Sequence, residues 1–210
     1  MATMLSLTEF VTEFDLKLKK IQYEVHPKYS VFTQYDKQFY LSRKEKFIHK
    51  YKCFSTITSI LKPNHIIELG TCAASAAHAY LYDSRNSFYT GYDVFGSPLD
   101  ENNNAWNSYE IAFNLLNEMC VDFKLYKENL RNVKELSKAD FVVVDADHSF
   151  DNAYKDCLLS LTADPQYIFI DDYSNHVVDA VKTFQELNKS IIDWTHIIKY
   201  VGNGYLIKFK

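Results

Sequence analysis

The chain has 210 residues, of which 47% are hydrophobic and 24% charged, so it is long enough for one globular domain with a substantial core. Its net charge of -4 at pH 7 argues against proteins that bind nucleic-acid phosphates through a clustered basic face. Four scattered cysteines, an N-terminus without a basic leader and the lack of a run of about 20 apolar residues argue against disulfide scaffolds, secreted precursors and membrane spans. We therefore expect a cytoplasmic protein.

The N-terminal part is predicted to be helical. Apolar residues recur at helical spacing over residues 7–21, and a second helix is expected from Ser42 to Leu61, where Pro63 stops it. Residues 27–40 are aromatic and polar and favour an irregular segment. Cationic residues of the second helix alternate with apolar positions, which indicates a solvated helix face rather than a nucleic-acid patch. These cations are Arg43, Lys44, Lys46, Lys50 and Lys52.

From residue 65 onward, strands are expected to alternate with helices. Short apolar runs predict the strands, and near-continuous apolar strands between helices are typical of a parallel sheet covered on both faces. The expected strands are residues 65–70, 88–93, 121–129, 140–147 and 166–173. The expected helices are residues 71–82, 107–119, 152–161 and 177–188, with a short helix at 130–136 and a polar loop at 95–106.

The end of the chain breaks this alternation. Residues 195–209 contain two alternating runs that flank Gly202-Asn203-Gly204, a strong signal for an antiparallel β-hairpin. We therefore predict a Rossmann-like α/β fold: a doubly wound sheet of about seven strands, mostly parallel, with a C-terminal antiparallel hairpin and N-terminal helices. Residues 1–62 are expected to be a helical extension packed on the core formed by residues 63–210.

The loop after the first strand is the expected ligand site, because open parallel sheets bind ligands beyond the carboxyl ends of their strands. Gly70 allows a close backbone approach, and the small residues Cys72 and Ala74 leave room beside it. Glu68 is placed to meet a ligand cation, and Asp93, which ends the second strand, could accept hydrogen bonds from two ribose hydroxyls. The alternative is that Gly70 only makes a tight turn and Asp93 caps local structure.

Acidic residues follow the next two buried strands. Asp145, Asp147 and His148 come after one strand, and Asp171 and Asp172 after the other. Adjacent strand ends lie about 5 Å apart, so these acids should converge, and their repulsion calls for a compensating cation such as Mg²⁺ with oxygen ligands. Helix capping is the alternative. It is preferred for Asp147, but it explains only one member of the pair Asp171 and Asp172.

Four segments carry a family resemblance: IIELGTCAASAA, YTGYDVFG, ADFVVVDADHSFDNAYKD and YIFIDDY. They resemble the class I S-adenosylmethionine-dependent methyltransferases, and are most similar to small metal-dependent O-methyltransferases of the catechol, caffeoyl-CoA and macrolide-sugar kind. The resemblance covers residues from about 64 to 210. It implies an enzyme that transfers a methyl group in line from S-adenosylmethionine to a small hydroxylated molecule of sugar or phenol type, assisted by Mg²⁺ or another divalent cation.

The resemblance also assigns roles to residues. The implied cofactor-binding residues are Glu68, Gly70, Thr71, Ala74, Asp93, Glu128, Asn129 and Asp145. The implied metal ligands are Asp145, Asp171 and Asp172, and the implied catalytic residues are Asp145 and His148, the latter as base for the acceptor hydroxyl. The family usually has further glycines in the first turn, where this chain has Cys72 and Ala74.

Two other classes of function remain open. Cys72 and Ala74 suggest a methyltransferase-fold protein that binds the cofactor or a partner without turnover. A nucleotide-sugar or NAD-type enzyme is disfavoured, since the turn lacks the GxGxxG pattern. The expected partner is a small-molecule acceptor rather than a nucleic acid or a membrane, and a homodimer is left open.

Overall fold

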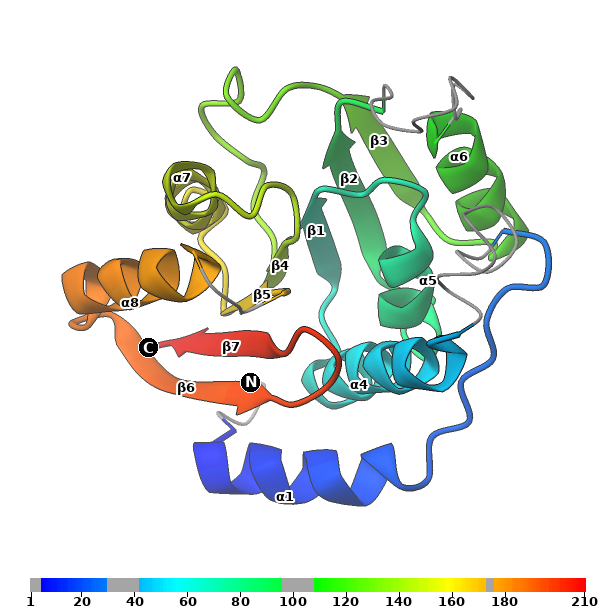
Figure 1. Ribbon diagram of the computed structural model, residues 1–210, viewed down its shortest axis with the longest axis horizontal. Helices are drawn as coiled ribbons and strands as arrows, with labels where there is room; N and C mark the ends of the chain where they lie inside the picture. Colours follow the sequence, from blue (N-terminus) through cyan, green and yellow to red (C-terminus); the bar gives the residue numbers. More distant parts are fainter. Residues whose placement is uncertain (1–4, 30–41, 96–107, 173–175) are drawn as a thin grey trace.

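The computed structural model describes residues 5–29, 42–95, 108–172 and 176–210. Within them, a seven-stranded sheet forms the centre of the protein, in the order β3-β2-β1-β4-β5-β7-β6 (Figure 1). Neighbouring strands among β1–β5 pair in parallel, whereas β7 runs antiparallel to β5 and β6. The predicted Rossmann-like sheet with a C-terminal hairpin is therefore confirmed. The strands are β1 His65–Leu69, β2 Phe88–Asp93, β3 Phe123–Lys127, β4 Phe141–Val144, β5 Tyr167–Ile170, β6 Ile192–Ile198 and β7 Gly204–Phe209.

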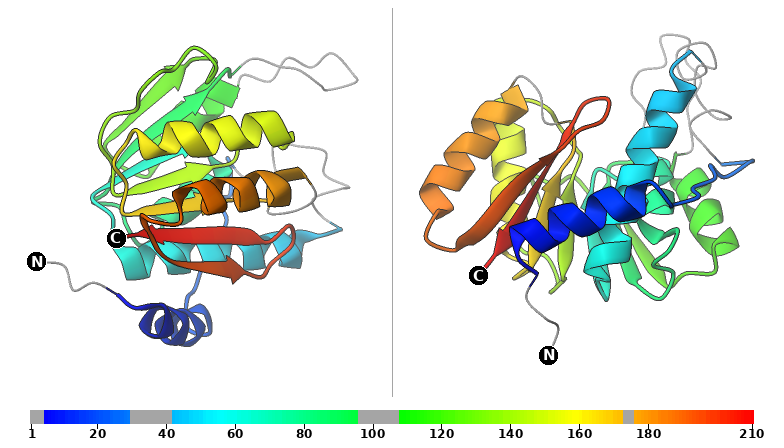
Figure 2. Two further views of the ribbon diagram at one scale, coloured as in Figure 1. Left: turned by 90° about the vertical axis from the view of Figure 1, so that its left-hand side faces the viewer. Right: turned by 90° about the horizontal axis from the view of Figure 1, so that it is seen from below.

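Helices cover both faces of the sheet. Helices α7 and α8 lie on one face, and α4, α5 and α6 lie on the other (Figure 1, Figure 2). Helix α1 packs outside this second layer, against α4 and strand β6. The helices are α1 Leu7–Leu18, α4 Lys44–Leu61, α5 Ser75–Leu81, α6 Ser108–Glu118, α7 Phe150–Leu161 and α8 His176–Asn188.

Side chains of the central strands alternate between two hydrophobic clusters. On β1, Ile66 packs into the cluster under α4, α5 and α6, whereas Ile67 packs into the cluster under α7 and α8. On β4, Phe141 and Val142 divide in the same way. Because both faces of these strands are buried, their sequences are apolar at nearly every position, which is why the pattern predicted a parallel sheet.

Helix α1 is attached to the C-terminal hairpin. The Phe10 side chain is fully buried, and its ring centroid lies 5.3 Å from that of Trp194 on β6. Trp194 Nε1 and Lys208 Nζ both donate hydrogen bonds to the carbonyl oxygen of Leu5, each at 3.1 Å. The beginning and end of the described chain are thus joined, while the division into residues 1–62 and 63–210 stays a prediction.

The helix predicted over residues 71–82 begins later, at Ser75. Cys72 and Ala74 have positive φ angles of 47° and 59°, which a right-handed helix cannot contain. The first four residues of the predicted helix therefore form the loop between β1 and α5.

The short helix predicted at 130–136 is wrong. The chain makes turns there, with hydrogen bonds from Asn132 N to the carbonyl oxygen of Asn129 (2.8 Å) and from Val133 N to that of Leu130 (3.3 Å). The Asn129 side chain also accepts a hydrogen bond from Arg131 N at 2.9 Å, and such local side-chain bonds compete with helix formation.

The predicted irregular segment and the predicted polar loop lie mostly outside the described residues, which omit 30–41 and 96–107. Among the helices that are described, none is both long enough and apolar enough to cross a bilayer.

The winding of the sheet reverses between β1 and β4. From β1 the chain continues to β2 on one side, while β4 lies on the other. The loop after each of these strands is bonded to a neighbouring strand, since Gly70 N donates to the Tyr92 carbonyl on β2 (2.9 Å) and Asp145 N to the Leu69 carbonyl on β1 (2.8 Å). Ligands of open α/β sheets bind at this reversal, and the predicted site residues lie there.

Candidate functional site

The turn after β1 has the backbone shape that glycine favours. Gly70 has a φ angle of 98°, and a Cβ atom at this position would collide with the carbonyl group of Asp145, so that only glycine fits. Cys72 and Ala74 then adopt positive φ without being glycine, at a cost of about 1–2 kcal/mol per residue. The turn therefore holds two residues other than glycine in a left-handed conformation, with strain.

Glu68, the residue before Leu69 on β1, is fully buried. Its Oε2 atom accepts a hydrogen bond from the Tyr89 hydroxyl, which lies 3.2 Å from the hydroxyl of Thr71. Its Oε1 atom has no hydrogen-bond partner among the described residues. Burial raises the pKa of Glu68 to about 8, although the Tyr89 hydrogen bond opposes this rise. A buried carboxyl oxygen without a partner is costly, and a ligand donor would satisfy it.

Asp93 anchors the turn to the end of β2. Its Oδ2 atom accepts a hydrogen bond from Cys72 N at 2.8 Å, and its Oδ1 atom accepts one from Phe95 N at 2.7 Å. Each carboxylate oxygen has two lone pairs, so both can accept a further hydroxyl group. The side chain is only partly buried.

Glu128 and Asn129 lie just beyond the end of β3, beside Asp93. Glu128 N donates a hydrogen bond to the Asp93 carbonyl oxygen at 2.9 Å, and both residues are exposed. The structure therefore places them at the same edge of the sheet as Asp93, on an open surface.

A cavity of about 490 Å³ lies between helix α4 and the turn after β1. Its volume is within the range of small-molecule sites. The cavity is lined by residues of α4, of the turn after β1 and of the loops after β4 and β5. They include Lys50, Tyr51, Gly70, Thr71, Asp145 and Asp172. Glu68, Asp93, Glu128 and Asn129 do not line it, so the predicted cofactor residues extend beyond this cavity along the sheet edge.

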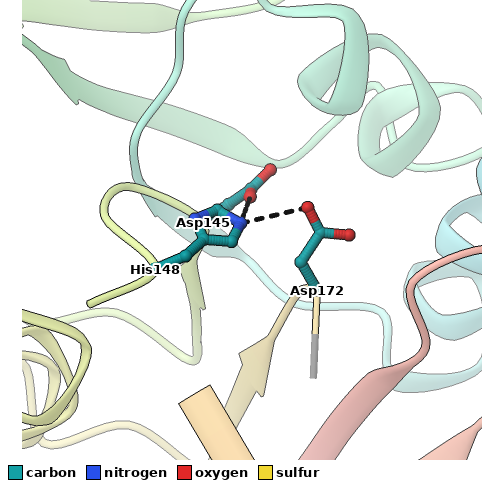
Figure 3. Close-up of side chains that lie close together, drawn as sticks. All are labelled: Asp145, His148 and Asp172. Carbon is teal, nitrogen blue, oxygen red and sulfur yellow. Dashed lines mark hydrogen bonds and ion pairs between the residues drawn. The ribbon is translucent and has the colours of Figure 1, made fainter. Parts of the chain in front are cut away.

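Asp145 and Asp172 line this cavity, and His148 lies beside them (Figure 3). One possible ligand atom from each of them lies within 4.8 Å of the others. His148 Nε2 is 3.0 Å from Asp172 Oδ2 and 3.9 Å from Asp145 Oδ1. Burial and the neighbouring charge of Asp171 raise the pKa of Asp145 well above its usual range, and the same two causes raise the pKa of Asp172.

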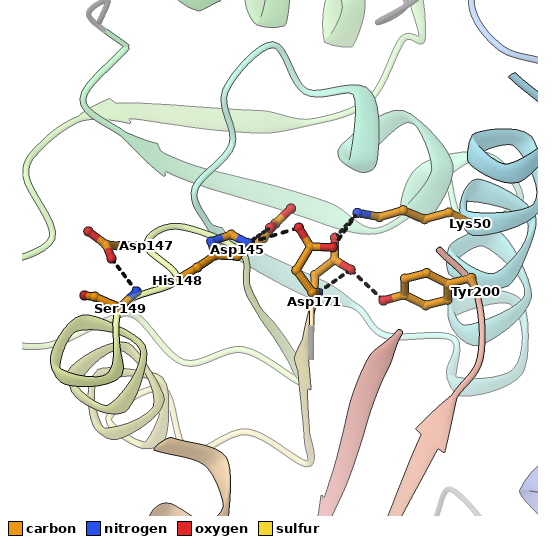
Figure 4. A network of polar contacts seen from close by, with 8 residues as sticks. Lys50, Asp145, Asp147, His148, Ser149, Asp171 and Tyr200 are labelled. Carbon is orange, nitrogen blue, oxygen red and sulfur yellow. Dashed lines mark hydrogen bonds and ion pairs between the residues drawn. The ribbon is translucent and has the colours of Figure 1, made fainter. Parts of the chain in front are cut away.

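Asp171 has a different environment from its neighbour Asp172. Its side chain is fully buried, and its Oδ1 atom accepts hydrogen bonds from the Tyr200 hydroxyl (2.6 Å) and from Asp172 N (2.8 Å). Its Oδ2 atom lies 2.5 Å from Lys50 Nζ (Figure 4). Lys50 Nζ is also 3.5 Å from Asp172 Oδ1. Both oxygens of Asp171 are therefore engaged by side chains from α4 and the β6–β7 hairpin.

The solvated helix face predicted for α4 is wrong for Lys50, whose side chain is only 12% exposed. Burial would lower the pKa of this ammonium group, but the charges of Asp171, Asp145 and Asp172 outweigh burial and raise it. A sequence signal existed, because Lys50 comes three residues after Phe47 and four before Phe54, on the apolar face of α4. Tyr200 carried no comparable signal.

The predicted metal ligands can be tested against these contacts. Asp145 and Asp172 remain close enough to share a cation with His148. Asp171 does not fit, because Lys50 and Tyr200 engage both of its oxygens. The residues present therefore do not form the predicted three-aspartate site while Lys50 keeps this position, and Mg²⁺ stays a prediction.

Asp147 points away from this group and serves the start of α7. Its Oδ1 atom accepts a hydrogen bond from Ser149 N at 2.8 Å, and its Oδ2 atom accepts one from the Asn152 side chain at 3.0 Å. The bond from the Ser149 backbone lowers the pKa of Asp147. The structural role that we preferred for Asp147 agrees with these contacts.

No family model matches the sequence, and no curated protein matches it. Solved structures do. A methyltransferase from Geobacter sulfurreducens has a TM-score of 0.62 and 12% identity, over 94% of this chain and 96% of that chain. The methyltransferase PaMTH1 of Podospora anserina, solved with S-adenosylhomocysteine, has a TM-score of 0.58 and 14% identity over 100% of both chains. The O-methyltransferase TomG of Streptomyces achromogenes, solved with S-adenosylmethionine, has a TM-score of 0.56 and 12% identity, over 96% of this chain and 99% of that chain.

The chain has the class I methyltransferase fold. At this low identity, the similarity shows a shared fold and no more. The matched region spans the whole chain, from helix α1 to the C-terminal hairpin. Within the methyltransferase fold, the turn after β1 and the acids after β4 and β5 lie at the carboxyl ends of the central strands.

Proposed function

We propose that the chain is an S-adenosylmethionine-dependent methyltransferase that acts on a hydroxyl group of a small molecule, of sugar or phenol type. One observation carries this proposal: a single cavity is lined both by Gly70 and Thr71 of the first turn and by Asp145 and Asp172, which lie beside His148. A cofactor held by the turn and an acceptor held by the acids would then meet in the same cavity. The methyltransferase fold supports this arrangement.

The first turn is proposed to hold the methionine end of the cofactor. The unpartnered Oε1 atom of Glu68 fits a donor such as an ammonium group. Gly70 lets the backbone approach a ligand closely, and Thr71 and Ala74 continue the same turn. Once bound, S-adenosylmethionine supplies a methyl group already activated on a sulfonium, so the protein has mainly to position the acceptor.

The remaining cofactor contacts are proposed along the edge of the sheet. Asp93 ends β2 with carboxylate oxygens that can accept hydroxyl groups of a ribose. Glu128 and Asn129 lie beside it after β3 and are proposed to border the adenine. Asp145 lines the cavity together with Gly70 and Thr71 and is proposed to contact the cofactor there.

His148 is proposed to accept the proton of the acceptor hydroxyl as the methyl group is transferred. A histidine can act as a general base near neutral pH. Asp172 at 3.0 Å and Asp145 at 3.9 Å hold its imidazole and would stabilise the positive charge that it gains. These contacts support the proposed catalytic roles of His148 and Asp145.

Three parts of the sequence prediction remain as expectations beside this proposal. Assistance by Mg²⁺ held by all three predicted aspartates requires Asp171 to leave its contacts with Lys50 and Tyr200, so no step proposed here passes through a metal. A cytoplasmic location is a further expectation. The acidic net charge of -4 favours a small-molecule acceptor over a nucleic acid, and a homodimer stays open.

A transfer assay tests the proposal. The full chain is incubated with S-adenosylmethionine and panels of catechols, phenols and sugars, and formation of S-adenosylhomocysteine is measured. We expect turnover with at least one hydroxylated class and a loss of about 100-fold or more in kcat for His148→Ala, because general bases contribute about 10²–10⁴-fold. Transfer to acceptors with only amino groups, or unchanged turnover in His148→Ala, would contradict it. Binding of S-adenosylmethionine without turnover on any acceptor would favour the alternative function, a methyltransferase-fold protein that binds the cofactor without transferring its methyl group.

A further inference from the structure

Lys50 reaches from helix α4 into the acidic group after β4 and β5. Its ammonium nitrogen lies 2.5 Å from Asp171 Oδ2 and 3.5 Å from Asp172 Oδ1. The same side chain lines the cavity that Asp145 and Asp172 also line. Figure 4 shows it pointing at the carboxylates from the side opposite His148.

The position of the ammonium group is fixed by its neighbours. The side chain is 12% exposed, and Nζ lies 5.5 Å from the ring centroid of Phe54 and 5.8 Å from that of Tyr200. Tyr200 donates its hydroxyl hydrogen to the other oxygen of Asp171 at 2.6 Å. The aromatic rings and the carboxylates therefore hold the cation where it is, whereas a surface lysine would move freely.

The charge of the site also depends on Lys50. Asp145, Asp171 and Asp172 bring carboxyl groups to one end of the sheet, and such groups repel one another unless a cation lies between them. In the part of the chain that the structure describes, Lys50 forms ion pairs with both Asp171 and Asp172, and His148 pairs with Asp172 when it is protonated. A divalent ion would supply the same compensation, but the predicted three-aspartate site needs an oxygen of Asp171 that Lys50 already engages.

We propose that the Lys50 ammonium is the resident cation of this site and takes the place that a divalent metal has in the enzymes the chain resembles. The site then needs no bound metal to hold its carboxylates together. At the cavity wall, the same positive charge favours an acceptor hydroxyl that becomes negative as it loses its proton. The catalytic part of this inference rests on the proposed function, since the Lys50 charge can stabilise an acceptor hydroxyl only if the cavity binds a methyl acceptor.

Binding of Mn²⁺ to the full chain tests the inference without cofactor or acceptor. Mn²⁺ prefers the same oxygen ligands as Mg²⁺, and the loss of its free electron paramagnetic resonance signal measures binding. We expect no binding to the unmodified chain at submillimolar Mn²⁺. Lys50→Met removes the cation and frees Asp171, so it should bind Mn²⁺ at least about tenfold more tightly than the unmodified chain.

Matched variants give the controls. Lys46→Met removes an exposed lysine from the same helix and should behave like the unmodified chain. Lys50→Arg keeps the positive charge and should also bind no Mn²⁺. Adding Asp172→Asn to Lys50→Met should remove the gained binding. Lys50→Gln is measured in parallel, with folding checked by circular dichroism, so that the result does not depend on the stability of one variant.

Two results would overturn the inference. One is submillimolar Mn²⁺ binding by the unmodified chain that Asp172→Asn abolishes, because a metal would then occupy the site with Lys50 present. The other is a folded Lys50→Met or Lys50→Gln that binds Mn²⁺ no better than the unmodified chain. Both results are measurements of Mn²⁺ binding and do not depend on turnover, so they can be interpreted even if the proposed methyl transfer is not found.

Discussion

Ala74 is fully buried and held at a φ angle of 59° in the turn after β1. Glycine at this position would avoid the steric cost of about 1–2 kcal/mol, although it would lose about 0.4–1 kcal/mol through the greater freedom of the unfolded chain. Glycine also removes a buried methyl group worth about 0.8 kcal/mol, so we expect Ala74→Gly to change the free energy of unfolding by less than about 0.5 kcal/mol. Urea unfolding followed by circular dichroism measures this change.

Ala76→Gly is the matched control, because Ala76 lies inside α5. Glycine within a helix costs about 0.5–1 kcal/mol relative to alanine, so this variant should lose stability. A loss of stability in Ala74→Gly as large as that in Ala76→Gly would show that the turn is not strained as described.

Glu68 makes the stability of the fold depend on pH. Its pKa is raised from 4.5 to about 8 in the folded chain, because the buried carboxyl group is more stable when protonated. The stabilising effect is complete below the unfolded value and is lost as pH rises through the folded value. We expect the free energy of unfolding to fall between about pH 5 and pH 8, by at most about 1.4 kcal/mol per pH unit from this residue.

Glu68→Gln isolates this contribution, since glutamine keeps the shape of the side chain without titrating. The difference in unfolding free energy between the unmodified chain and the variant should shrink, then change sign, as pH rises. Tyr89→Phe removes the hydrogen bond that lowers the pKa of Glu68, so the fall should extend to higher pH. Parallel pH profiles for the unmodified chain and Glu68→Gln would contradict the assignment.

At the scale of elements, the site is assembled by parts of the chain that are distant in sequence. Helix α4 supplies Lys50, and the loop after β6 supplies Tyr200, and both bind Asp171 at the end of β5. Gly202 in the same loop lies so close to Asp172 that a Cβ atom there would collide with its carboxylate. The C-terminal hairpin therefore forms one edge of the sheet, and its loop contributes to the acidic end of the cavity.

The attachment of α1 predicts a contrast between two residues of that helix. Phe10 is fully buried and contacts Trp194, whereas Leu16 is 54% exposed. Phe10→Ala should lower the free energy of unfolding by about 3–5 kcal/mol, because it removes a buried ring and leaves a cavity. Leu16→Ala should change it by less than about 0.5 kcal/mol. Similar, small effects of both substitutions in urea unfolding would show that α1 is not part of the folded core.

At the scale of the whole molecule, the sheet was predictable because its physical cause is local. Strands β4 and β5 are buried on both faces, so nearly every side chain is apolar, and the pattern needs no knowledge of neighbours. The hairpin was predictable for a similar reason, since Gly202-Asn203-Gly204 separates two alternating runs.

Features that arise from contacts between distant segments were not predictable in this way. The late start of α5 follows from the close crossing of the turn after β1 and the Asp145 backbone. The ion pair of Lys50 with Asp171 depends on the position at which α4 crosses the sheet. Helical periodicity in the sequence does not predict that position. The available signal is a charged residue among aromatic ones on the apolar face of α4, whereas the alternation of cations with apolar positions favours a solvated face.

Binding of S-adenosylhomocysteine to the full chain, measured by isothermal titration calorimetry, tests the central claim most directly. We expect one molecule to bind per chain with a Kd of about 100 µM or below, equivalent to roughly -5.5 kcal/mol. Asp93→Ala should weaken binding at least about tenfold, because it removes the anchor of the turn and the proposed ribose acceptor. No heat of binding at millimolar ligand, from a chain shown to be folded, would contradict a cofactor site at the turn after β1.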